Sequence, residues 1–497
     1  MSYKKTKTIT LFWISIASVL WAQSFIDGEP SIFKRQDISV TGALRELSLE
    51  KVIPGGGDEL VVLERTGKYP HWQVDLSIYR FSDNRVKPLK KLSIPADTLF
   101  YGFISNTSKN QSALVLVRPK ELEVLFSKDS TWNDVKNVKI PLSSGFEVNQ
   151  DGLARPIDYQ FENGGATFFV PVRTGIDVFK LSDSMVTFDG HYQIPPMAYY
   201  LSSSESMALD IPFWVRASFW FPSPVRGMLK NSNHVLLFPW MDEVFIQPIA
   251  YKEKSKRFVF QRLSEDERED GQTQVVTHAL DLNGDGRTDF LMNKFKGAAT
   301  SLTAETTLHL TANDGSIDAS GLRLQPEGNR AAGAVAIDLN QDGKMELAVA
   351  SSQFNAWAIA RALTQRQVKV MFSFYFYHER GYQLSRPDFT REILFGFDLS
   401  DLDIDGVLPI LTGDFNGDGY PDALYARNRK RLTILIQKPK SKDVFPDVPS
   451  GEYDVQVLRK IRIGDLNGDG KSDIVMYDRK SRFNKKFTVL LNAGKFK

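Results

Sequence analysis

The sequence predicts an all-β fold, and three observations lead to that prediction. Short apolar runs, separated by Gly, Pro, Asn, Asp and Ser, recur along the whole chain of 497 residues. Aromatic residues make up 12% of the chain, and 34 residues are Phe, whose bulky rings suit pleated and half-buried surfaces. Helical periodicity is scarce, and the one fair candidate is SQFNAWAIARALTQRQ from Ser352.

The strand-like runs repeat along the chain. Most of their starts are spaced by roughly 50 to 60 residues, and each is followed by a second β-prone run such as VDLSIYRF from Val74. A period of this length that holds several short strands is the signature of a repeated β-sheet unit. The eight runs are ELVVLER from Glu59, SALVLVRP from Ser112, ATFFVPV from Ala166, HVLLFPW from His234, DFLMN from Asp289, ELAVA from Glu346, DALYA from Asp422 and DIVMYD from Asp473.

Radial repetition explains the length of the chain, the short and evenly spaced strands and the scarcity of helices together. We predict a β-propeller of about eight, alternatively seven, four-stranded blades. The last unit supplies only three strands, so we expect the ring to be closed by an N-terminal strand, with DISVTG from Asp37 as the candidate. A protein of two sandwiches, or of several β-domains, is the alternative architecture.

The N-terminus has the pattern of a secretory leader. Three lysines precede an apolar run from Ile9 to Ala22, which is too short to span a bilayer comfortably. We predict a signal peptide over residues 1–24 and a single propeller domain over residues 25–497, with an uncleaved N-terminal anchor as the alternative. The protein is thus expected to be exported, to the periplasm, the cell surface or the medium, with no transmembrane segment after leader removal.

Charge and cysteine content narrow the possible partners. Removing the three leader lysines from the 62 basic residues leaves 59 against 60 acidic ones, so nothing in the balance suggests a nucleic-acid partner. The chain has no Cys, so disulfides cannot stabilise an exported form. Its stability must come from packing and, on the evidence of the loops below, from metal.

Four nine-residue segments in the second half of the chain share the pattern D-x-N-x-D-G-x-x-[DE]. Positions 1, 3, 5 and 9 carry side-chain oxygens, and the Gly at position 6 permits a sharp bend. Alternate side chains on such a loop converge, and a hard cation such as Ca²⁺ takes six to eight oxygen ligands, here including the carbonyl of position 7. We therefore predict up to four Ca²⁺ sites. Their ligands are Asp281, Asn283, Asp285, Arg287 and Asp289; Asp338, Asn340, Asp342, Lys344 and Glu346; Asp414, Asn416, Asp418, Tyr420 and Asp422; and Asp465, Asn467, Asp469, Lys471 and Asp473.

An EF-hand and a plain turn are the two alternative interpretations of these loops. An EF-hand begins in the same way but needs a Glu at position 12 and flanking helices, whereas here the closing acid stands at position 9 and a strand-like run follows. A plain Asn-Gly or Asp-Gly turn explains the glycines but not several neighbouring carboxylates, which would repel one another without a cation. Two weaker matches, from Asp401 and Val148, are interpreted as ordinary turns.

These segments resemble the calcium loops of the FG-GAP/VCBS repeat family, the β-propeller type also seen in integrin α-subunits. The resemblance implies that each loop joins the first and second strands of a blade and that calcium rigidifies it. It is specific over roughly residues 275–495. Residues 57–262 share only the spacing and the strand pattern, and they are expected to form degenerate blades.

No catalytic motif accompanies the loops, and no catalytic residue is assigned. Cationic hairpins at 427–431 and 478–486 are expected on the face opposite the loops, where they are candidates for binding an acidic partner, although solvated turns are the simpler interpretation. We predict an exported, calcium-stabilised propeller that serves as a non-catalytic binding or assembly module for a protein or glycan ligand. The alternative is a propeller-borne enzyme on polysaccharide, either a lyase or a glycosidase.

Overall fold

The computed structural model describes residues 32–497 with the exception of short stretches, so the predicted signal peptide and most of the weak match from Val148 lie outside the described residues. Not described are 1–31, 54–56, 69–70, 107–110, 128–131, 133–134, 146–154, 157–158, 163–164, 173, 183–184, 194–196, 199–218, 221–224, 231–232, 250–253, 261–262, 270–272, 297–302, 325–329, 332, 354–355, 400–402, 440–443, 480–483, 495 and 497.

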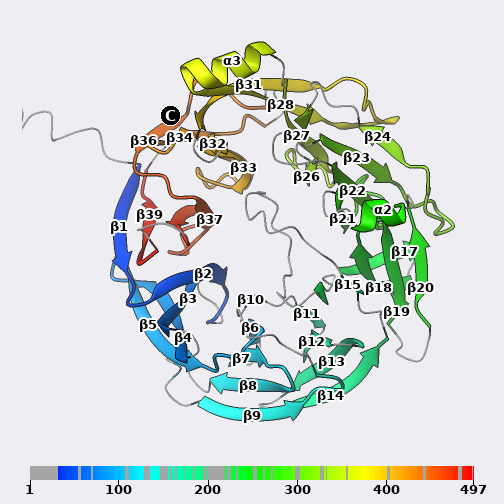
Figure 1. The fold of residues 1–497 in the computed structure, drawn as a ribbon, viewed down its shortest axis with the longest axis vertical. Helices are drawn as coiled ribbons and strands as arrows, with labels where there is room; N and C mark the ends of the chain where they lie inside the picture. Colours follow the sequence, from blue (N-terminus) through cyan, green and yellow to red (C-terminus); the bar gives the residue numbers. More distant parts are fainter. Residues whose placement is uncertain are drawn as a thin grey trace, which may run out of the picture.

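Ten sheets form in the described part of the chain, and eight of them follow one another around a ring (Figure 1). Each of the eight contains four successive antiparallel strands, with the first strand nearest the centre, and one of them has a further strand at its rim. This is a β-propeller of eight four-stranded blades, which confirms the first prediction over the seven-bladed alternative.

Blades 1 to 4 form the half of the ring without aspartate loops. In order from the centre outward, their strands are β2 (Ala43–Glu50), β3 (Glu59–Lys68), β4 (His71–Ser82) and β5 (Arg85–Ile94); β6 (Phe100–Asn106), β7 (Gln111–Val117), β8 (Glu121–Ser127) and β9 (Val135–Pro141); β11 (Tyr159–Glu162), β12 (Gly165–Val172), β13 (Gly175–Ser182) and β14 (Met185–Tyr192); and β17 (Val225–Lys230), β18 (Asn233–Trp240), β19 (Glu243–Pro248) and β20 (Lys256–Val259). In addition, β10 (Arg155–Pro156) pairs with β6 in parallel, and β15 (Met197–Ala198) pairs with β16 (Phe219–Trp220).

Blades 5 to 8 form the half with the loops. Their strands are β21 (Thr273–Leu280), β22 (Asp289–Lys296), β23 (Thr303–His309) and β24 (Leu322–Leu324); β25 (Arg330–Ala331) and β26 (Val335–Ile337) end to end along the next strand, then β27 (Glu346–Ser352), β28 (Gln367–Tyr375), β31 (Phe389–Asp398) and, as a fifth strand, β32 (Asp403–Asp405); β33 (Val407–Gly413), β34 (Asp422–Asn428), β35 (Arg431–Leu435) and β36 (Gly451–Asp454); and β37 (Lys460–Gly464), β38 (Asp473–Tyr477), β39 (Lys486–Asn492) and β1 (Phe33–Ser39). A small hairpin of β29 (Tyr377–His378) and β30 (Gly381–Tyr382) is inserted before β31.

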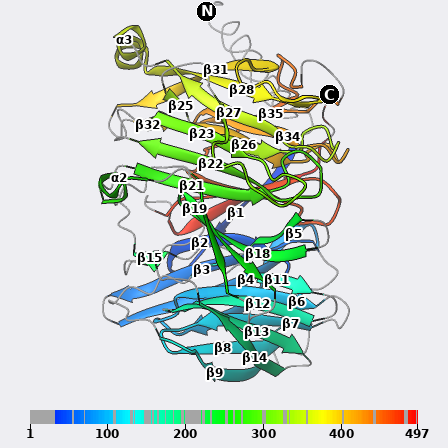
Figure 2. The ribbon, with the colours of Figure 1, turned by 90° about the vertical axis from the view of Figure 1, so that its right-hand side faces the viewer.

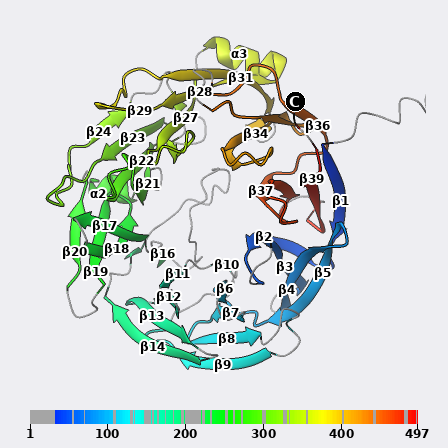
Figure 3. The same ribbon diagram turned by 180° about the vertical axis from the view of Figure 1, so that it is seen from behind.

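The N-terminal strand β1 closes the ring, as predicted, by pairing antiparallel with β39 from Phe33 opposite Asn492 to Ser39 opposite Lys486 (Figure 3). The strand begins at Phe33 and covers only the first three residues of the candidate run DISVTG. Its sequence, FKRQDIS, is mostly polar because one side of a rim strand faces solvent, so apolar patterning did not mark its start.

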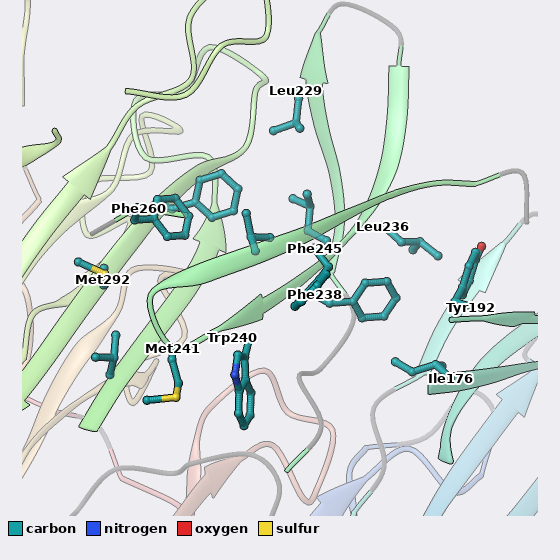
Figure 4. Packing of buried hydrophobic residues seen from close by; sticks show 14 of the residues in the cluster. Ile176, Tyr192, Leu229, Leu236, Phe238, Trp240, Met241, Phe245, Phe260 and Met292 are labelled. Atoms are coloured by element: carbon teal, nitrogen blue, oxygen red, sulfur yellow. The ribbon is translucent and has the colours of Figure 1, made fainter. Parts of the chain in front are cut away.

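All eight apolar runs found in the sequence are the second strands of the eight blades. These strands are apolar because adjacent blades cover both faces of each sheet. In β38, for example, every residue is buried. Among the described residues, seven clusters of buried side chains lie between neighbouring blades. One of them joins blades 3, 4 and 5 through Tyr192, Phe238 and Met292 (Figure 4).

Successive strands are antiparallel, so the connections between first and second strands all emerge on one face of the ring, called here the loop face. Connections between second and third strands emerge on the opposite face. The predicted helix is α3 (Ala356–Gln365), between β27 and β28, and Figure 2 shows it on the same side as the five-residue α2 (Glu265–Glu269). No helix in the described part of the chain is long and apolar enough to cross a membrane.

The two cationic hairpins lie between second and third strands, as expected. Within the first of them, Arg429 pairs with Asp405 at 2.9 Å, and Arg431 pairs with Asp454 and Glu452. These acids belong to strands of the same or the preceding blade. For Arg429 and Arg431, the structure therefore favours the simpler interpretation, because acids of the protein already pair with these two side chains.

Candidate metal centres

The four aspartate loops occupy four consecutive blades on one face of the ring. Each joins the first strand of its blade to the second, as the resemblance implied: residues 281–288 in blade 5, 338–345 in blade 6, 414–421 in blade 7 and 465–472 in blade 8. The match from Asp401 forms β32 from Asp403 onward and takes no part in this arrangement.

The loop backbone is held by the first aspartate. In blade 5, the Asp281 carboxylate accepts hydrogen bonds from the backbone amides of Gly284 at 2.8 Å, Asp285 at 3.2 Å and Gly286 at 2.7 Å. Positions 4 and 6 of this loop have φ values of 73° and 80°, in the left-handed region that glycine adopts without strain. The loops from Asp414 and Asp465 repeat the same bonds.

The closing acid at position 9 is buried and ties the loop to the third strand of its blade. Asp289 accepts the backbone amide of Leu282 at 3.1 Å and that of Thr311, beyond the end of β23, at 2.7 Å. Asp422 and Asp473 accept the equivalent pairs of amides in blades 7 and 8. In blade 6, Glu346 accepts the Leu339 amide at 2.7 Å. All four carboxylates are at most 1% exposed.

Burial disfavours the ionised form of these four carboxylates. It raises the pKa of Asp289 to about 7, against the backbone hydrogen bonds, and the nearby Asp285 and Asp281 raise it further. The same causes raise the pKa of Glu346 to about 7, that of Asp422 to about 6 and that of Asp473 to about 7. A cation between the acids would remove this penalty, because it favours the ionised form.

The donor set of each loop fits a hard cation. Side-chain oxygens at positions 1, 3, 5 and 9, with the carbonyl of position 7, are the ligands that Ca²⁺ prefers. Among the described residues, however, no group of three acidic, His or Cys side chains is gathered closely enough to hold a metal ion as it stands. The predicted ligands are thus brought into one loop on a shaped backbone, and their side chains would still have to converge on the ion.

The contacts of the side chain at position 7 differ between loops, which the sequence did not reveal. In blade 5, the Arg287 guanidinium folds back on the Asp285 carboxylate and also donates to the carbonyl of Thr311 at 3.0 Å. In blade 6, the Lys344 ammonium lies 5.2 Å from the centre of the Tyr377 ring. The first loop therefore carries a cation of its own beside one of its predicted ligands.

The loops are joined to one another in a continuous arc, and no sequence motif indicated this. The backbone amide of Met345, at position 8 of the second loop, donates to the Leu282 carbonyl of the first at 3.0 Å. The Ser472 amide, at position 8 of the fourth, donates to the Asp414 carbonyl of the third at 2.7 Å. Between the second and third loops, Gln341 contacts the Gly419 carbonyl instead. Hydrogen bonds thus link each of the four predicted sites to the next one along the arc.

The β29–β30 hairpin reinforces the first of these junctions. The Tyr382 hydroxyl lies 3.0 Å from the Leu282 carbonyl and 2.6 Å from the Met345 carbonyl, so it bridges two loops. Burial, and to a lesser degree the neighbouring carboxylates of Glu346 and Asp289, raise the pKa of Tyr382 above its ordinary value. The hydroxyl therefore stays protonated and able to donate.

Comparison with known proteins adds a family to this geometry. Residues 279–349 and 414–476 match the family described as FG-GAP-like repeat, and these two stretches contain all four loops. No curated protein matches the chain.

Solved structures with a similar outline have little sequence in common with the chain. The structure of Sqt1 from Chaetomium thermophilum is 9% identical, with a TM-score of 0.45, and covers 93% of this chain and 100% of its own. A protein from Lactobacillus plantarum is 11% identical, with a TM-score of 0.34 and coverages of 85% and 99%. The Dos1 propeller is 7% identical, with a TM-score of 0.37 and coverages of 81% and 94%.

The strand order, the position of the loops between first and second strands, and the two matching stretches agree with one another. The chain is therefore an eight-bladed β-propeller that carries FG-GAP-like repeats in the blades that hold its four aspartate loops.

Proposed function

We propose that this protein is an exported, calcium-stabilised β-propeller that serves as a binding or assembly module. The observation that carries the proposal is the arc of four loops with buried closing acids. Each loop has the oxygen donors of a calcium site, and each closing acid has a pKa that is raised by burial and, to a lesser degree, by the neighbouring acids of its loop. Calcium in the arc would hold four consecutive blades, and with them half of the ring, in one arrangement.

A rigid ring suits binding because it presents fixed connections on two faces. On the face opposite the loops, α3 exposes Trp357 (66%) and Leu363 (59%), and the Arg361 guanidinium lies 4.3 Å from the centre of the Trp357 ring. Exposed aromatic and apolar side chains beside a cation are typical of interaction surfaces. They support this face as the one that contacts a protein or glycan ligand.

One cluster in the described part of the chain has the residue types of a Ser-His-Asp catalytic triad. In blade 3, Ser143, Asp177 and His191 lie together, but the Ser143 hydroxyl donates to Asp177, and both contact Nδ1 of His191. A base that activates a nucleophile takes its proton on one ring nitrogen while a carboxylate holds the other. This cluster has the wrong arrangement for that role, and it fastens residue 143 to the blade.

Calorimetry and thermal unfolding test the calcium part of the proposal. Titration to millimolar CaCl₂ is expected to show binding heat, since extracellular calcium modules bind at about 10⁻⁴ to 10⁻³ M. EDTA is expected to lower the unfolding temperature. A variant with Asp285, Asp342, Asp418 and Asp469 all changed to Ala is expected to lose both effects. Absence of binding heat, together with an unfolding temperature that EDTA does not change, would refute the calcium role.

The binding part is tested with the same two proteins. Immobilised wild type is expected to retain a ligand from an envelope extract or an anionic glycan panel in calcium, and to release it in EDTA, whereas the quadruple variant retains less. Incubation with the same anionic glycans distinguishes the alternative. Shortening of the glycan, or new unsaturated ends, would establish a glycosidase or a lyase and overturn the non-catalytic assignment.

A further inference from the structure

In blade 1, the described ends of the segment KVIPGGGDE, residues 51–53 and 57–59, make contacts like those of the four aspartate loops. The segment joins the first strand of its blade, β2, to the second, β3, as the four aspartate loops do. Glu59 stands at position 9, and its carboxylate accepts the backbone amide of Val52, seven residues earlier, at 3.0 Å. Leu282 and Asp289 make the same bond with the same separation.

This segment has lost the residues that would hold a cation. Lys51 and Ile53 stand where the other loops have Asp and Asn. Burial raises the pKa of Glu59, and the Arg80 guanidinium, 3.8 Å away across the sheet, partly opposes this shift. The bond of the closing acid is therefore retained, and an arginine stands near it as the positive charge.

Position 8 of this segment closes the arc onto the last aspartate loop. The Asp58 amide donates to the Asp465 carbonyl at 2.9 Å, and the Asp58 carboxylate accepts a hydrogen bond from the Asp465 backbone. Two other junctions have the same reciprocal pair of bonds. Ser472 donates its amide to Asp414 at 2.7 Å and accepts the Asp414 amide at 2.9 Å. Thr288 and Met228 do likewise at 2.7 and 3.0 Å.

The acceptor is a hydroxyl at those two junctions and a carboxylate at this one. Asp58 is half-buried beside Asp465, and Lys51 is the basic side chain near it. A negative side chain thus lies beside the first predicted ligand of the fourth loop, at the junction where the last blade meets the first. Such a pair is repulsive without a cation, and it attracts a cation placed between the acids and the loop.

We propose that Asp58 is a positioning residue of the cation site in the Asp465 loop, so that the junction between blade 8 and blade 1 is strengthened by the bound cation. The proposal rests on the calcium role proposed above. It adds that residues of the first and the last blade together form one of the four sites. The ring is then closed twice, by the pairing of β1 with β39 and by a cation-dependent contact on the loop face.

The test uses Asp58→Ser, because Ser occupies position 8 in blade 8. This change keeps an acceptor for the Asp465 amide and removes only the charge. Asp447→Ser, at a fully exposed acid in blade 7, is the control for net charge. Calorimetry with CaCl₂ alone is expected to show one site weakened roughly tenfold in Asp58→Ser, since affinity follows the charge around the site. The other three sites, and all four in the control, should be unchanged.

Stability in EDTA provides the second measurement. There, Asp58→Ser is expected to unfold at a higher temperature than wild type, because the repulsion with Asp465 has gone, whereas Ser472→Asp should unfold at a lower one. Hydrogen exchange in wild type should rise on calcium removal at 43–50 and 460–464, which face each other across the junction.

The outcomes separate the two proposals. If wild type binds calcium and Asp58→Ser binds it with four unchanged affinities, the role of Asp58 is wrong and the calcium role stands. If wild type binds no calcium, the calcium role fails and the inference fails with it. If exchange at the junction does not respond to calcium in a protein that binds it, the cation-dependent closure is overturned.

Discussion

The side-chain amide of Gln341 donates a hydrogen bond to the backbone carbonyl of Gly419, and this bond joins the second aspartate loop to the third. The third loop has Pro421 at position 8, which has no amide hydrogen, so the bond found at the other junctions is unavailable there. Gln341 takes the place of the glycine that the other three loops have at position 4, and it adopts a φ of 59°. A departure from the motif thus compensates for a neighbouring proline.

The Gln341 contact predicts different effects for two substitutions. Gln341→Ala removes the bond and leaves a side chain in the left-handed region, so it should lower the free energy of unfolding by roughly 1–2 kcal/mol. Gln341→Gly also removes the bond but relieves the backbone, and it should cost about 1 kcal/mol less. Urea unfolding in calcium measures both. An alanine variant as stable as wild type would mean that the contact contributes nothing to the arc.

The Tyr382 hydroxyl predicts a second effect, on the junction between the first two loops. Tyr382→Phe removes its contacts with the Leu282 and Met345 carbonyls inside a buried site. It is expected to lower the free energy of unfolding by about 1–2 kcal/mol. The matched control is Tyr377→Phe, on the same hairpin, whose hydroxyl takes no part in this bridge. Equal losses for the two variants would assign the effect to the hairpin instead of the bridge.

The eight-bladed ring could be predicted because an apolar run of side chains recurs once in every blade. The second strand of every blade is covered on both faces, so each reads as an apolar run, as ELVVLER and DIVMYD do. The rim strand β1 was placed four residues late because its polar sequence is defined by backbone pairing with β39. The five-residue α2 was missed because it is too short to show a periodicity.

The acidic residues of the four loops made the loops recognisable in the sequence. The contacts between the loops could not be predicted from it. Backbone donors such as the amides of Met345 and Ser472 leave no trace in the sequence. The segment at 51–59 escaped notice because it keeps only a glycine at position 6 and the closing Glu59 of the pattern. Its identity depends on the Val52–Glu59 and Asp58–Asp465 bonds. The Ca²⁺ sites remain a prediction from the donor set.

Arg287 predicts that the first loop differs from the others in calcium affinity. Its guanidinium occupies the Asp285 carboxylate, which a cation would need. Arg287→Gln should therefore raise the calcium affinity of one site about three- to tenfold, by removing a competing positive charge. In EDTA the same variant should be less stable by about 1 kcal/mol, because Asp285 loses its partner. Lys471→Gln, the same position in the fourth loop, is the control and should change affinity less. Calorimetry that shows equal changes would contradict the competition.

The buried closing acids predict an unusual pH dependence in the absence of calcium. Burial raises the pKa of Asp289 and Asp473 to about 7, whereas an unfolded Asp has a pKa of about 3.9. Between these values the folded protein holds protons that the unfolded chain has released, so stability falls as pH rises. In EDTA, each of these two acids should make the free energy of unfolding about 2 kcal/mol higher at pH 5 than at pH 7.5.

Calcium should remove this dependence, and the comparison isolates the acids. The cation binds the ionised carboxylates, so it lowers their pKa in the folded state and closes the window between pH 4 and 7. Burial lowers the pKa of His278 and His309, which makes stability rise with pH and opposes the acids in both conditions. The difference between unfolding curves measured with EDTA and with millimolar CaCl₂ therefore cancels the histidines. It should grow steadily from pH 5 to pH 7.5, and a difference that stays constant would show that the closing acids are ionised throughout.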